Sequence, residues 1–433
     1  MPLDMIVGTQ WGDEGKGRIT DYLAAGADLV ARAAGGDNAG HTVSVGSQVF
    51  RLHLVPSGIL HPQACCILGN GMVVNPIRLT AELDELEAQG VDVSPHRLKL
   101  SHASHVITPG HLALDGAEEA RRGQAELGTT RRGIGPAYSD KSARRGLRAG
   151  AMCDPEAFGR QVEESVHRAG EILEAIYHLP APNTTESGRL YRECAERLRP
   201  YLADTGAIVA QALQERRTVL AEGAQGALLD LDHGTYPHVT SSQTTSAGAL
   251  AGLGVGPRHL RRVVGVAKAF QTRVGGGAFP TEARGEAAER LRGTGENPWD
   301  EFGATTGRPR RTGWLDGVLL RYAARLNDLT ELALTKLDVL SGLPSIPICV
   351  AYEVGEQCYE DLPVSPADLA SVRPVYEELP GWEAELGAVR DWGELPGHAQ
   401  RYVERIERLV GLPIRWISVG PAREQIVCRG AKP

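Results

Sequence analysis

The sequence has 433 residues, 42% of them hydrophobic, and a formal net charge of −8, which supports a large core and argues against nucleic-acid or membrane partners, since these need a basic face. No run approaches the roughly 18 apolar residues of a membrane span, and the first residues do not have the pattern of a secretion signal. Seven scattered cysteines match no zinc or disulfide pattern, so we expect a reduced, cytoplasmic protein.

Strands and helices alternate along the chain. The first element is an apolar strand at residues 3–8, and a helix at 16–25 follows a glycine-rich loop. Further strands are expected at 29–33, 65–68, 219–221, 263–267, 332–335 and 414–419, and further helices at 77–89, 154–177 and 184–217. This alternation predicts an α/β fold with a large central sheet, mixed but mostly parallel, flanked by helices. Two long loops rich in Gly and Arg, at 127–150 and 293–313, are expected to be functional.

The loop Gly8-Thr-Gln-Trp-Gly-Asp-Glu-Gly-Lys-Gly17 joins the first strand to the first helix. Its glycines let backbone N–H groups approach phosphate oxygens, and Lys16 adds a positive charge at the start of the helix. A standard P-loop has Ser or Thr after the lysine as a magnesium ligand, whereas this chain has Gly17. Asp13 can instead supply a carboxylate to the metal or accept a proton. The alternative is a loop that binds phosphate without catalysis.

A second glycine-rich turn, Asn38-Ala-Gly-His-Thr42, carries His41. A lone histidine is more often structural, but one beside a loop with an acid and a lysine is also a candidate general acid.

The segment Thr335-Lys336-Leu337-Asp338 follows an apolar strand. The Asp338 carboxylate could accept hydrogen bonds from both N1–H and the 2-amino group of guanine, a donor pair that adenine does not present in that arrangement. We therefore expect GTP rather than ATP.

Three arginines, Arg308, Arg310 and Arg311, lie in a glycine-bounded loop at 303–313, and guanidinium groups suit carboxylates and phosphates. The alternative is a solvated basic loop. A second anion-friendly segment contains Thr130 and Arg144, which could hold a phosphate together.

Gln225 and Thr240 lie in turns that offer neutral polar groups, which orient a ligand more than they activate it. His102-x-x-His105 and Asp230-Leu-Asp232-His233 are possible transition-metal ligands, but neither pattern has a third partner at a familiar spacing.

Eight segments in order resemble the adenylosuccinate synthetase family, across nearly the whole chain. They are the loop at 8–17, Gly-Asp-Asn-Ala-Gly-His-Thr at 36–42, Gly-Ile-Gly-Pro-Ala-Tyr at 133–138, Glu-Gly-Ala-Gln-Gly at 222–226, Asp-His-Gly-Thr-Tyr-Pro at 232–237, Gly-Ala-Thr-Thr-Gly-Arg at 303–308, Thr-Lys-Leu-Asp at 335–338 and Ser-Val-Gly-Pro at 418–421. Two positions depart from that pattern: the Arg131-Arg132 pair has an extra arginine, and Ala422 stands where an acidic residue is frequent.

The resemblance implies a P-loop-like, GTPase-related core and a single catalytic domain over residues 1–433. It also implies a ligase that forms adenylosuccinate from IMP and L-aspartate with hydrolysis of GTP, through a 6-phosphoryl-IMP intermediate, as the first committed step from IMP to AMP. One Mg²⁺ per subunit is expected on Asp13 and the Gly40 carbonyl, and Asp13, His41 and Gln225 are the implied catalytic residues.

The implied binding residues fall into three groups. For IMP they are Asp13, Lys16, Asn38, His41, Thr130, Arg144, Gln225, Thr240 and Arg308. For aspartate they are Ala304, Thr305, Thr306, Arg308 and Arg310. For GTP they are Gly12, Glu14, Gly15, Lys16, Gly17, Gly40, Thr42, Arg310, Lys336, Asp338, Ser418 and Gly420.

The resemblance also implies a homodimer in which Arg144 reaches the partner's site. Two other classes of protein remain as alternatives. One is a GTP-binding regulator that uses the Lys-x-Asp segment. The other is a dinucleotide-binding oxidoreductase, against which the missing Gly-x-Gly-x-x-Gly pattern argues.

Overall fold

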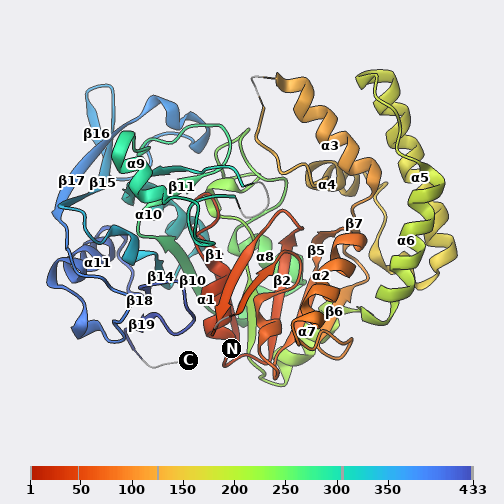
Figure 1. Cartoon of the computed structure of the whole chain (residues 1–433), viewed down its shortest axis with the longest axis horizontal. Helices are drawn as coiled ribbons and strands as arrows, with labels where there is room; N and C mark the ends of the chain where they lie inside the picture. Colours follow the sequence, from red (N-terminus) through yellow and green to blue (C-terminus); the bar gives the residue numbers. More distant parts are fainter. Residues whose placement is uncertain (1, 47, 124–125, 304–306, 431–433) are drawn as a thin grey trace.

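The fold is built around one large sheet (Figure 1). The computed structural model describes residues 2–46, 48–123, 126–303 and 307–430. The strands of the sheet are β1 (Leu3–Gly8), β2 (Leu29–Gly35), β5 (Cys65–Val74), β6 (Leu98–Ser101), β7 (His105–Val106), β8 (Leu202–Ala203), β9 (Val219–Glu222), β10 (Leu260–Lys268), β14 (Glu331–Thr335), β18 (Ile414–Ser418) and β19 (Ile426–Cys428). In the described part of the chain their order is β19-β18-β14-β10-β1-β9-β2-β5-β6-β8, with β7 paired to β5.

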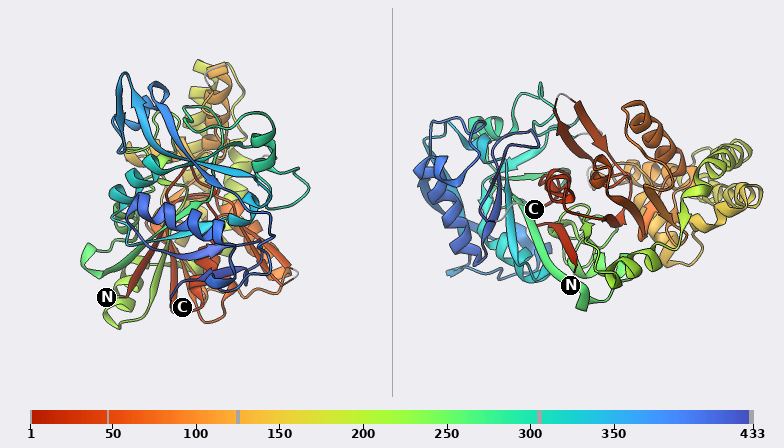
Figure 2. Two further views of the ribbon diagram at one scale, coloured as in Figure 1. Left: turned by 90° about the vertical axis from the view of Figure 1, so that its left-hand side faces the viewer. Right: turned by 90° about the horizontal axis from the view of Figure 1, so that it is seen from below.

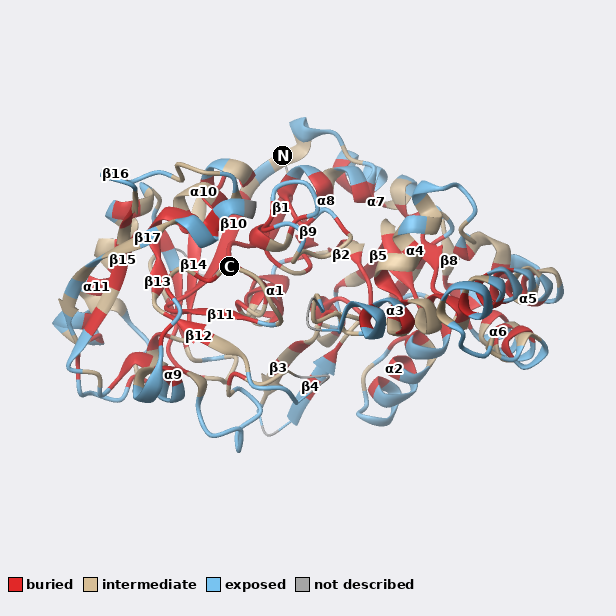
Figure 3. Cartoon of the chain, turned by 90° about the horizontal axis from the view of Figure 1, so that it is seen from above, coloured by how far each residue is buried: buried red, intermediate tan, exposed pale blue. Residues whose placement is uncertain are grey.

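All of these neighbours are parallel except β18 and β19, which are antiparallel. The large, mostly parallel sheet expected from the sequence is therefore confirmed. Parallel strands are buried on both faces and read as continuous apolar runs. Every residue of the central strand β1 is buried, and its neighbour β10 is buried from Val263 to Lys268 (Figure 3).

Helices flank the sheet (Figures 1 and 2). They are α1 (Lys16–Ala24), α2 (Pro76–Ala88), α3 (Pro109–Arg122), α4 (Ile134–Ser142), α5 (Pro155–Ile172), α6 (Thr184–Leu198), α7 (Thr205–Gln214), α8 (Ser246–Leu253), α9 (Gly285–Arg292), α10 (Gly317–Asn327) and α11 (Gly397–Val410). Helices α5 and α6 pack along each other at one end of the molecule. Of the described helices, none is both long enough and apolar enough to cross a bilayer.

The single helix expected at 184–217 is wrong, because the chain forms two helices there. Helix α6 ends at Leu198, and the ring of Pro200 cannot donate the backbone hydrogen bond that a continuing helix needs. Helix α7 then starts afresh, capped by the Asp204 side chain, which accepts a hydrogen bond from the Ala207 N–H at 3.0 Å. The charged composition of the segment concealed this break.

Smaller sheets complete the fold. β3 (His41–Val45) and β4 (Gln48–Leu52) pair antiparallel, as do β11 (Gln271–Arg273) and β12 (Arg311–Gly313). A third sheet contains β13 (Leu315–Asp316), β15 (Ser345–Val354), β16 (Gln357–Tyr359) and β17 (Arg373–Pro380). Figure 1 shows β15, β16 and β17 at the end of the molecule opposite α5 and α6.

Candidate active site

The parallel order of the sheet gathers the segments that the sequence singled out. The carboxyl ends of parallel strands lie at one edge, and ligands of α/β proteins bind beside that edge. The loops that leave β1, β2, β9, β14 and β18 at this edge carry Asp13, Lys16, Asn38, Gln225, Lys336, Asp338 and Gly420. His41 follows the turn after β2, at the first position of β3. Segments hundreds of residues apart in sequence therefore meet.

The loop after β1 is folded around a buried carboxylate. Glu14 is fully buried, and its Oε1 accepts hydrogen bonds from the N–H groups of Gln10 and Gly12, each at 3.0 Å. Its Oε2 pairs with the Lys16 ammonium at 2.5 Å. The side chain of Glu14 thus holds the loop in shape, so a role of this residue toward GTP belongs to its backbone. Asp13, with φ of 57°, remains partly exposed.

The missing P-loop hydroxyl has a steric cause. A Cβ atom on Gly17 would lie 2.5 Å from the Cβ and 2.7 Å from the Cγ of His41. Any side chain at this position would push His41 away, so the hydroxyl that binds magnesium in a standard P-loop is incompatible with a histidine here. The two sequence oddities, Gly17 and His41, are therefore one structural feature.

A buried glutamate orients His41. Its Nδ1 contacts the Oε1 of Glu222, whose carboxylate also accepts the N–H of Ser57 at 2.8 Å and the Ser57 hydroxyl at 3.1 Å. Burial by itself raises the pKa of Glu222, but His41 and the buried Arg32 outweigh burial and lower it. An ionised Glu222 favours a proton on Nδ1 and leaves Nε2 as the nitrogen for a ligand.

The side chains of Gln225 and Asn38 are in contact with each other. The amide nitrogen of Gln225 donates to Oδ1 of Asn38 at 3.2 Å. The Oε1 of Gln225 is buried and accepts no hydrogen bond from the described residues. An unpaired buried acceptor is costly, so this oxygen is suited to a donor on a bound ligand.

Helix α3 holds the loop that contains Thr130. The Asp115 carboxylate accepts from the Thr129 hydroxyl at 3.0 Å and from the Gly133 N–H at 2.8 Å. Arg132, the second residue of the Arg131-Arg132 pair, faces the buried Asp37 at 3.7 Å and so ties this loop to the turn of Asn38.

Among the described residues, Arg144 and Thr240 form no hydrogen bond or ion pair with another of the predicted residues. Arg144 is exposed just beyond α4 with φ of 61°. The Thr240 N–H donates to the carbonyl of Leu229, eleven residues earlier in the chain, at 2.9 Å.

The loop at 303–313, here called the arginine loop, contacts the loop at 8–17, here called the phosphate loop. The Nε of Arg310 lies 2.9 Å from Oδ2 of Asp13, and only 11% of the Arg310 side chain is exposed. Arg308 is exposed. The predicted residues Ala304, Thr305 and Thr306 lie outside the described residues.

Glu301, which sequence patterns did not indicate, forms ion pairs with three basic side chains. Its side chain is 1% exposed and pairs with Lys268 at 2.8 Å, with Arg310 at 2.7 Å and with Lys336. Burial alone would raise the pKa of Glu301, but the three cations lower it far below the ordinary value. Burial lowers the pKa of Lys268 to about 7.

Arg18 of α1 holds the turn that contains Ser418 and Gly420. Its guanidinium donates to the Ser418 hydroxyl at 2.5 Å, to the Gly420 carbonyl, to the Ala422 carbonyl at 2.6 Å and to the Gln425 carbonyl at 3.0 Å. These contacts fix the turn of Ser418 and Gly420 against the helix after the phosphate loop. Only the backbone of Ala422 takes part, so its departure from the family pattern leaves this turn intact.

One of the possible transition-metal ligands, Asp230, has a structural role. Asp230 accepts N–H hydrogen bonds from Asp232 at 3.0 Å, His233 at 3.1 Å and Thr244 at 2.6 Å, so it shapes a turn. Burial lowers the pKa of His105 to about 4. No cluster of three or more His, Cys, Asp or Glu suited to a metal occurs in the described ranges.

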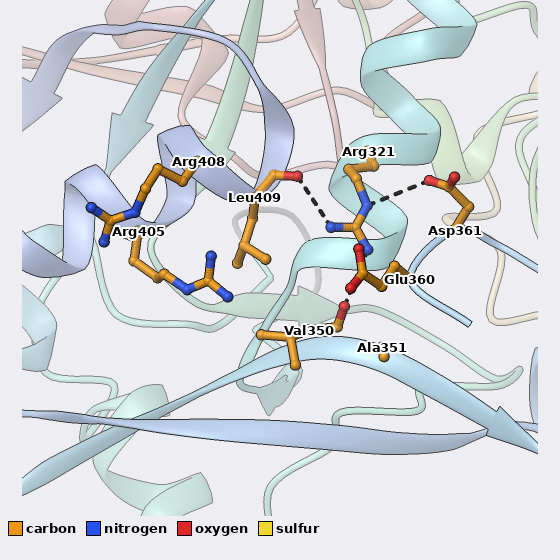
Figure 4. Close-up of a pocket in the computed structure, with 8 residues that line it drawn as sticks. All are labelled: Arg321, Val350, Ala351, Glu360, Asp361, Arg405, Arg408 and Leu409. Atoms are coloured by element: carbon orange, nitrogen blue, oxygen red, sulfur yellow. Dashed lines mark hydrogen bonds and ion pairs between the residues drawn. The ribbon is translucent and has the colours of Figure 1, made fainter. Parts of the chain in front are cut away.

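A cavity of about 340 Å³ lies elsewhere, between α10, β15 and α11 (Figure 4). Two of its three arginines already have partners: Arg321 donates to the carbonyls of Leu409 and Val350, each at 3.1 Å, and Arg405 pairs with Glu377 at 2.7 Å. None of the residues predicted for the site lines it.

A simple signal marks two residues whose roles the sequence patterns did not indicate. Glu222 ends the buried strand β9 and Lys268 ends β10, whereas Glu301 comes after helix α9 rather than a strand and has no such signal. Charged residues at the carboxyl ends of buried strands are unfavourable unless they are paired, so they indicate a site.

Comparisons with known proteins agree with one another. A family model described as adenylosuccinate synthetase matches residues 5–427. The chain is 53% identical over 423 residues to the adenylosuccinate synthetase of Moorella thermoacetica, with 98% of each chain covered. It is 52% identical over 422 residues to that of Desulforudis audaxviator, with 97% of this chain and 96% of the relative covered.

The structure is also similar to that of the fully ligated adenylosuccinate synthetase from Plasmodium falciparum. The TM-score is 0.92 at 37% identity, with 99% of this chain and 100% of the other covered.

Proposed function

The chain belongs to the adenylosuccinate synthetase family, and from this premise we propose how its residues carry out the reaction. The protein is a ligase that joins IMP to L-aspartate in purine biosynthesis, with GTP as co-substrate. The GTP-binding regulator and the oxidoreductase are accordingly set aside. We treat residues 1–433 as one cytoplasmic catalytic domain whose site is assembled along the whole chain.

The C6 oxygen of IMP is a poor leaving group, so the first step makes it a better one. In this proposal Asp13 takes the N1 proton of IMP, and the C6 oxygen attacks the γ-phosphorus of GTP, breaking its bond to the β–γ bridging oxygen. The electron pair of that bond stays on GDP, and 6-phosphoryl-IMP forms. The amine of aspartate then adds at C6 and inorganic phosphate leaves. The partly exposed Asp13 carboxylate at the carboxyl end of β1 supports the first role.

His41 donates a hydrogen bond to the oxygen on the leaving side, where negative charge develops as GDP forms. Glu222 holds its Nδ1, so we assign the donation to Nε2. Lys16 leaves Glu14 for the phosphates, and the buried Oε1 of Gln225 accepts a donor from IMP. Asn38, Thr130, Thr240 and Arg308 complete the proposed IMP contacts.

The residues present are compatible with Mg²⁺. This ion binds proteins through one or two carboxylates and substrate phosphates, keeping several waters, and Asp13 with the Gly40 carbonyl provides such a donor set. When bound, the ion would neutralise phosphate charge. Asp13 would hold it with one oxygen and keep the other for the proton.

We assign aspartate binding to the segment 304–310. In it, Arg308 and Arg310 would pair with the carboxylates of the substrate aspartate. The guanine base is read by Asp338 and enclosed by Lys336 and the turn of Ser418 and Gly420.

The observation that carries the assignment is the Asp13–Arg310 contact at 2.9 Å, which joins the phosphate loop to the aspartate-binding segment. Positional isotope exchange tests the order of steps. GTP labelled with ¹⁸O in the β–γ bridge should scramble its label with IMP present and aspartate absent, and should not scramble without IMP. Scrambling that needs aspartate would refute the phosphorylated intermediate.

We further propose a homodimer in which Arg144 completes the partner's site. The exposed position of Arg144 just beyond α4, where a partner could reach it, supports this. Mixing inactive Arg144→Ala with inactive Asp13→Asn should restore about a quarter of wild-type activity, since half of the dimers are mixed and each of these has one intact site. No recovery after mixing under conditions of subunit exchange would rule out the shared site.

A further inference from the structure

We infer that Glu301 is a positioning residue that couples the guanine end of the site to the aspartate-binding segment. The inference rests on the proposed function of those two regions. Its basis is geometric: one buried carboxylate holds a cation from each of them. Neither cation is adjacent to Glu301 in sequence.

The two carboxylate oxygens of Glu301 pair with different cations. Its Oε1 pairs with Lys336, which belongs to the guanine motif. Its Oε2 pairs with Arg310 at 2.7 Å and with Lys268, at the end of β10, at 2.8 Å. Arg310 in turn contacts Asp13 at 2.9 Å. A continuous chain of ion pairs therefore runs from the guanine motif through Glu301 to the phosphate loop.

The carboxylate is the common element of this chain. A buried carboxylate requires compensating charge, and three cations close together require a carboxylate. A shift of Lys336 when the base binds therefore changes the field on Glu301 and hence the position of Arg310. Coupling of this kind is reciprocal, so GTP should raise the affinity for aspartate as much as aspartate raises the affinity for GTP.

Glu301→Gln is a suitable test because each cation keeps another partner. Lys336 still donates to the Trp299 carbonyl at 2.8 Å, Lys268 to the Thr272 hydroxyl at 2.5 Å, and Arg310 still contacts Asp13. The backbone of residue 301 also keeps its place, since its N–H donates to the Arg292 carbonyl at 2.8 Å and its carbonyl accepts from the Arg310 N–H at 2.9 Å.

The experiment measures steady-state synthesis over a grid of GTP and aspartate concentrations. In the wild type, the apparent KM for aspartate should fall as GTP rises. In Glu301→Gln we expect the KM for GTP and for aspartate each to rise about tenfold, the KM for IMP to stay within about twofold, and the dependence of one KM on the other substrate to vanish. Glu296→Gln, an exposed carboxylate in the same segment, is the control and should behave as wild type.

Persistence of the coupling in Glu301→Gln would overturn the inference, as would equal changes in all three KM values or a loss confined to kcat. If the single variant fails to fold, Glu301→Gln combined with Lys268→Met removes the carboxylate together with its most buried cation, and the same pattern is expected. The proposed function fails separately: in that case the wild type itself makes no adenylosuccinate.

Discussion

The two sides of the site each contain a buried carboxylate, Glu14 and Glu301, but they differ in how closely the backbone around it is packed. Around the loop of residues 8–17, backbones and side chains approach so closely that only glycine fits: a Cβ on Gly8 would lie 2.5 Å from the Gln225 carbonyl, and one on Gly226 would lie 2.3 Å from the Gln10 carbonyl. Around Glu301, by contrast, buried ion pairs hold Arg310, a proposed aspartate ligand, beside Lys268 at the end of β10.

This difference corresponds to what each side must do. Phosphoryl transfer needs donors and acceptors in fixed positions, which close packing supplies. Arg310, in the proposed aspartate site, is held by ion pairs that can be exchanged for contacts with a ligand. The phosphate side is therefore expected to be sensitive to small steric changes, and the aspartate side to changes of charge.

The largest effect is expected from Asp13→Asn, which removes the proton acceptor while preserving size. Synthesis should fall by a factor of about 10² to 10⁴, whereas GTP binding should stay nearly unchanged because Lys16 and the loop backbone remain. Turnover and GTP titration measure the two quantities. Asp361→Asn, at an exposed carboxylate, is the control; near-normal turnover of Asp13→Asn would remove its role as a base.

Gly17→Ser tests the steric side directly, because it restores the residue of a standard P-loop. We expect kcat/KM to fall by about 100-fold, since the new Cβ displaces His41 and a shift near 1 Å in a catalytic group has an effect of this size. The same substitution at Gly116 of α3, where a Cβ meets nothing within 4 Å, should have little effect. Wild-type activity in Gly17→Ser would show that His41 is not held there for catalysis.

Asp338→Asn tests base reading, which belongs to neither side of the comparison. The amide would donate to the C2 oxygen of xanthine, so the preference for GTP over XTP should fall by a factor equivalent to about 1–3 kcal/mol. Competition kinetics with the two nucleotides measures it. An unchanged preference would place guanine recognition on other residues.

The smallest and most gradual effect concerns charge and pH. The cations lower the pKa of Glu301 below 4.5, so its contribution to the free energy of unfolding is complete above pH 4.5 and is lost as the pH falls further. In a Lys268→Met background, Lys336 and Arg310 still lower the pKa of Glu301, so this variant should lose stability below pH 4.5 faster than Lys268→Met/Glu301→Gln, by at most about 1.4 kcal/mol per pH unit. Urea unfolding compares the pair, and Lys268 is removed from both so that its own titration does not contribute. Parallel pH profiles would contradict the charge-based account.

Local patterns were enough to predict the sheet and the loops that leave it. The apolar run of β1, the glycines after it and the Thr335–Asp338 segment each carry their information within a few residues. The parallel arrangement then follows from the alternation of elements, and it alone brings the loops to one edge.

What the sequence did not reveal depends on contacts between distant residues. Glu301 and Lys268 meet only because β10 and the segment after α9 are folded together, and Arg18 reaches the turn of Ser418 across the sheet. Neither pair has a sequence signature, since ion pairing depends on position in space rather than on spacing along the chain. Pro200 is a local signal for the end of α6, but the charged residues on both sides of it fit one continuous helix, so the pattern alone did not predict the break.

The most direct test of the account is a product assay with GTP, IMP, aspartate and Mg²⁺, in which each component is omitted in turn. We predict adenylosuccinate and an equal amount of GDP from the complete mixture, and no net release of phosphate when IMP or aspartate is missing. Hydrolysis of GTP at the same rate without IMP and aspartate would contradict it.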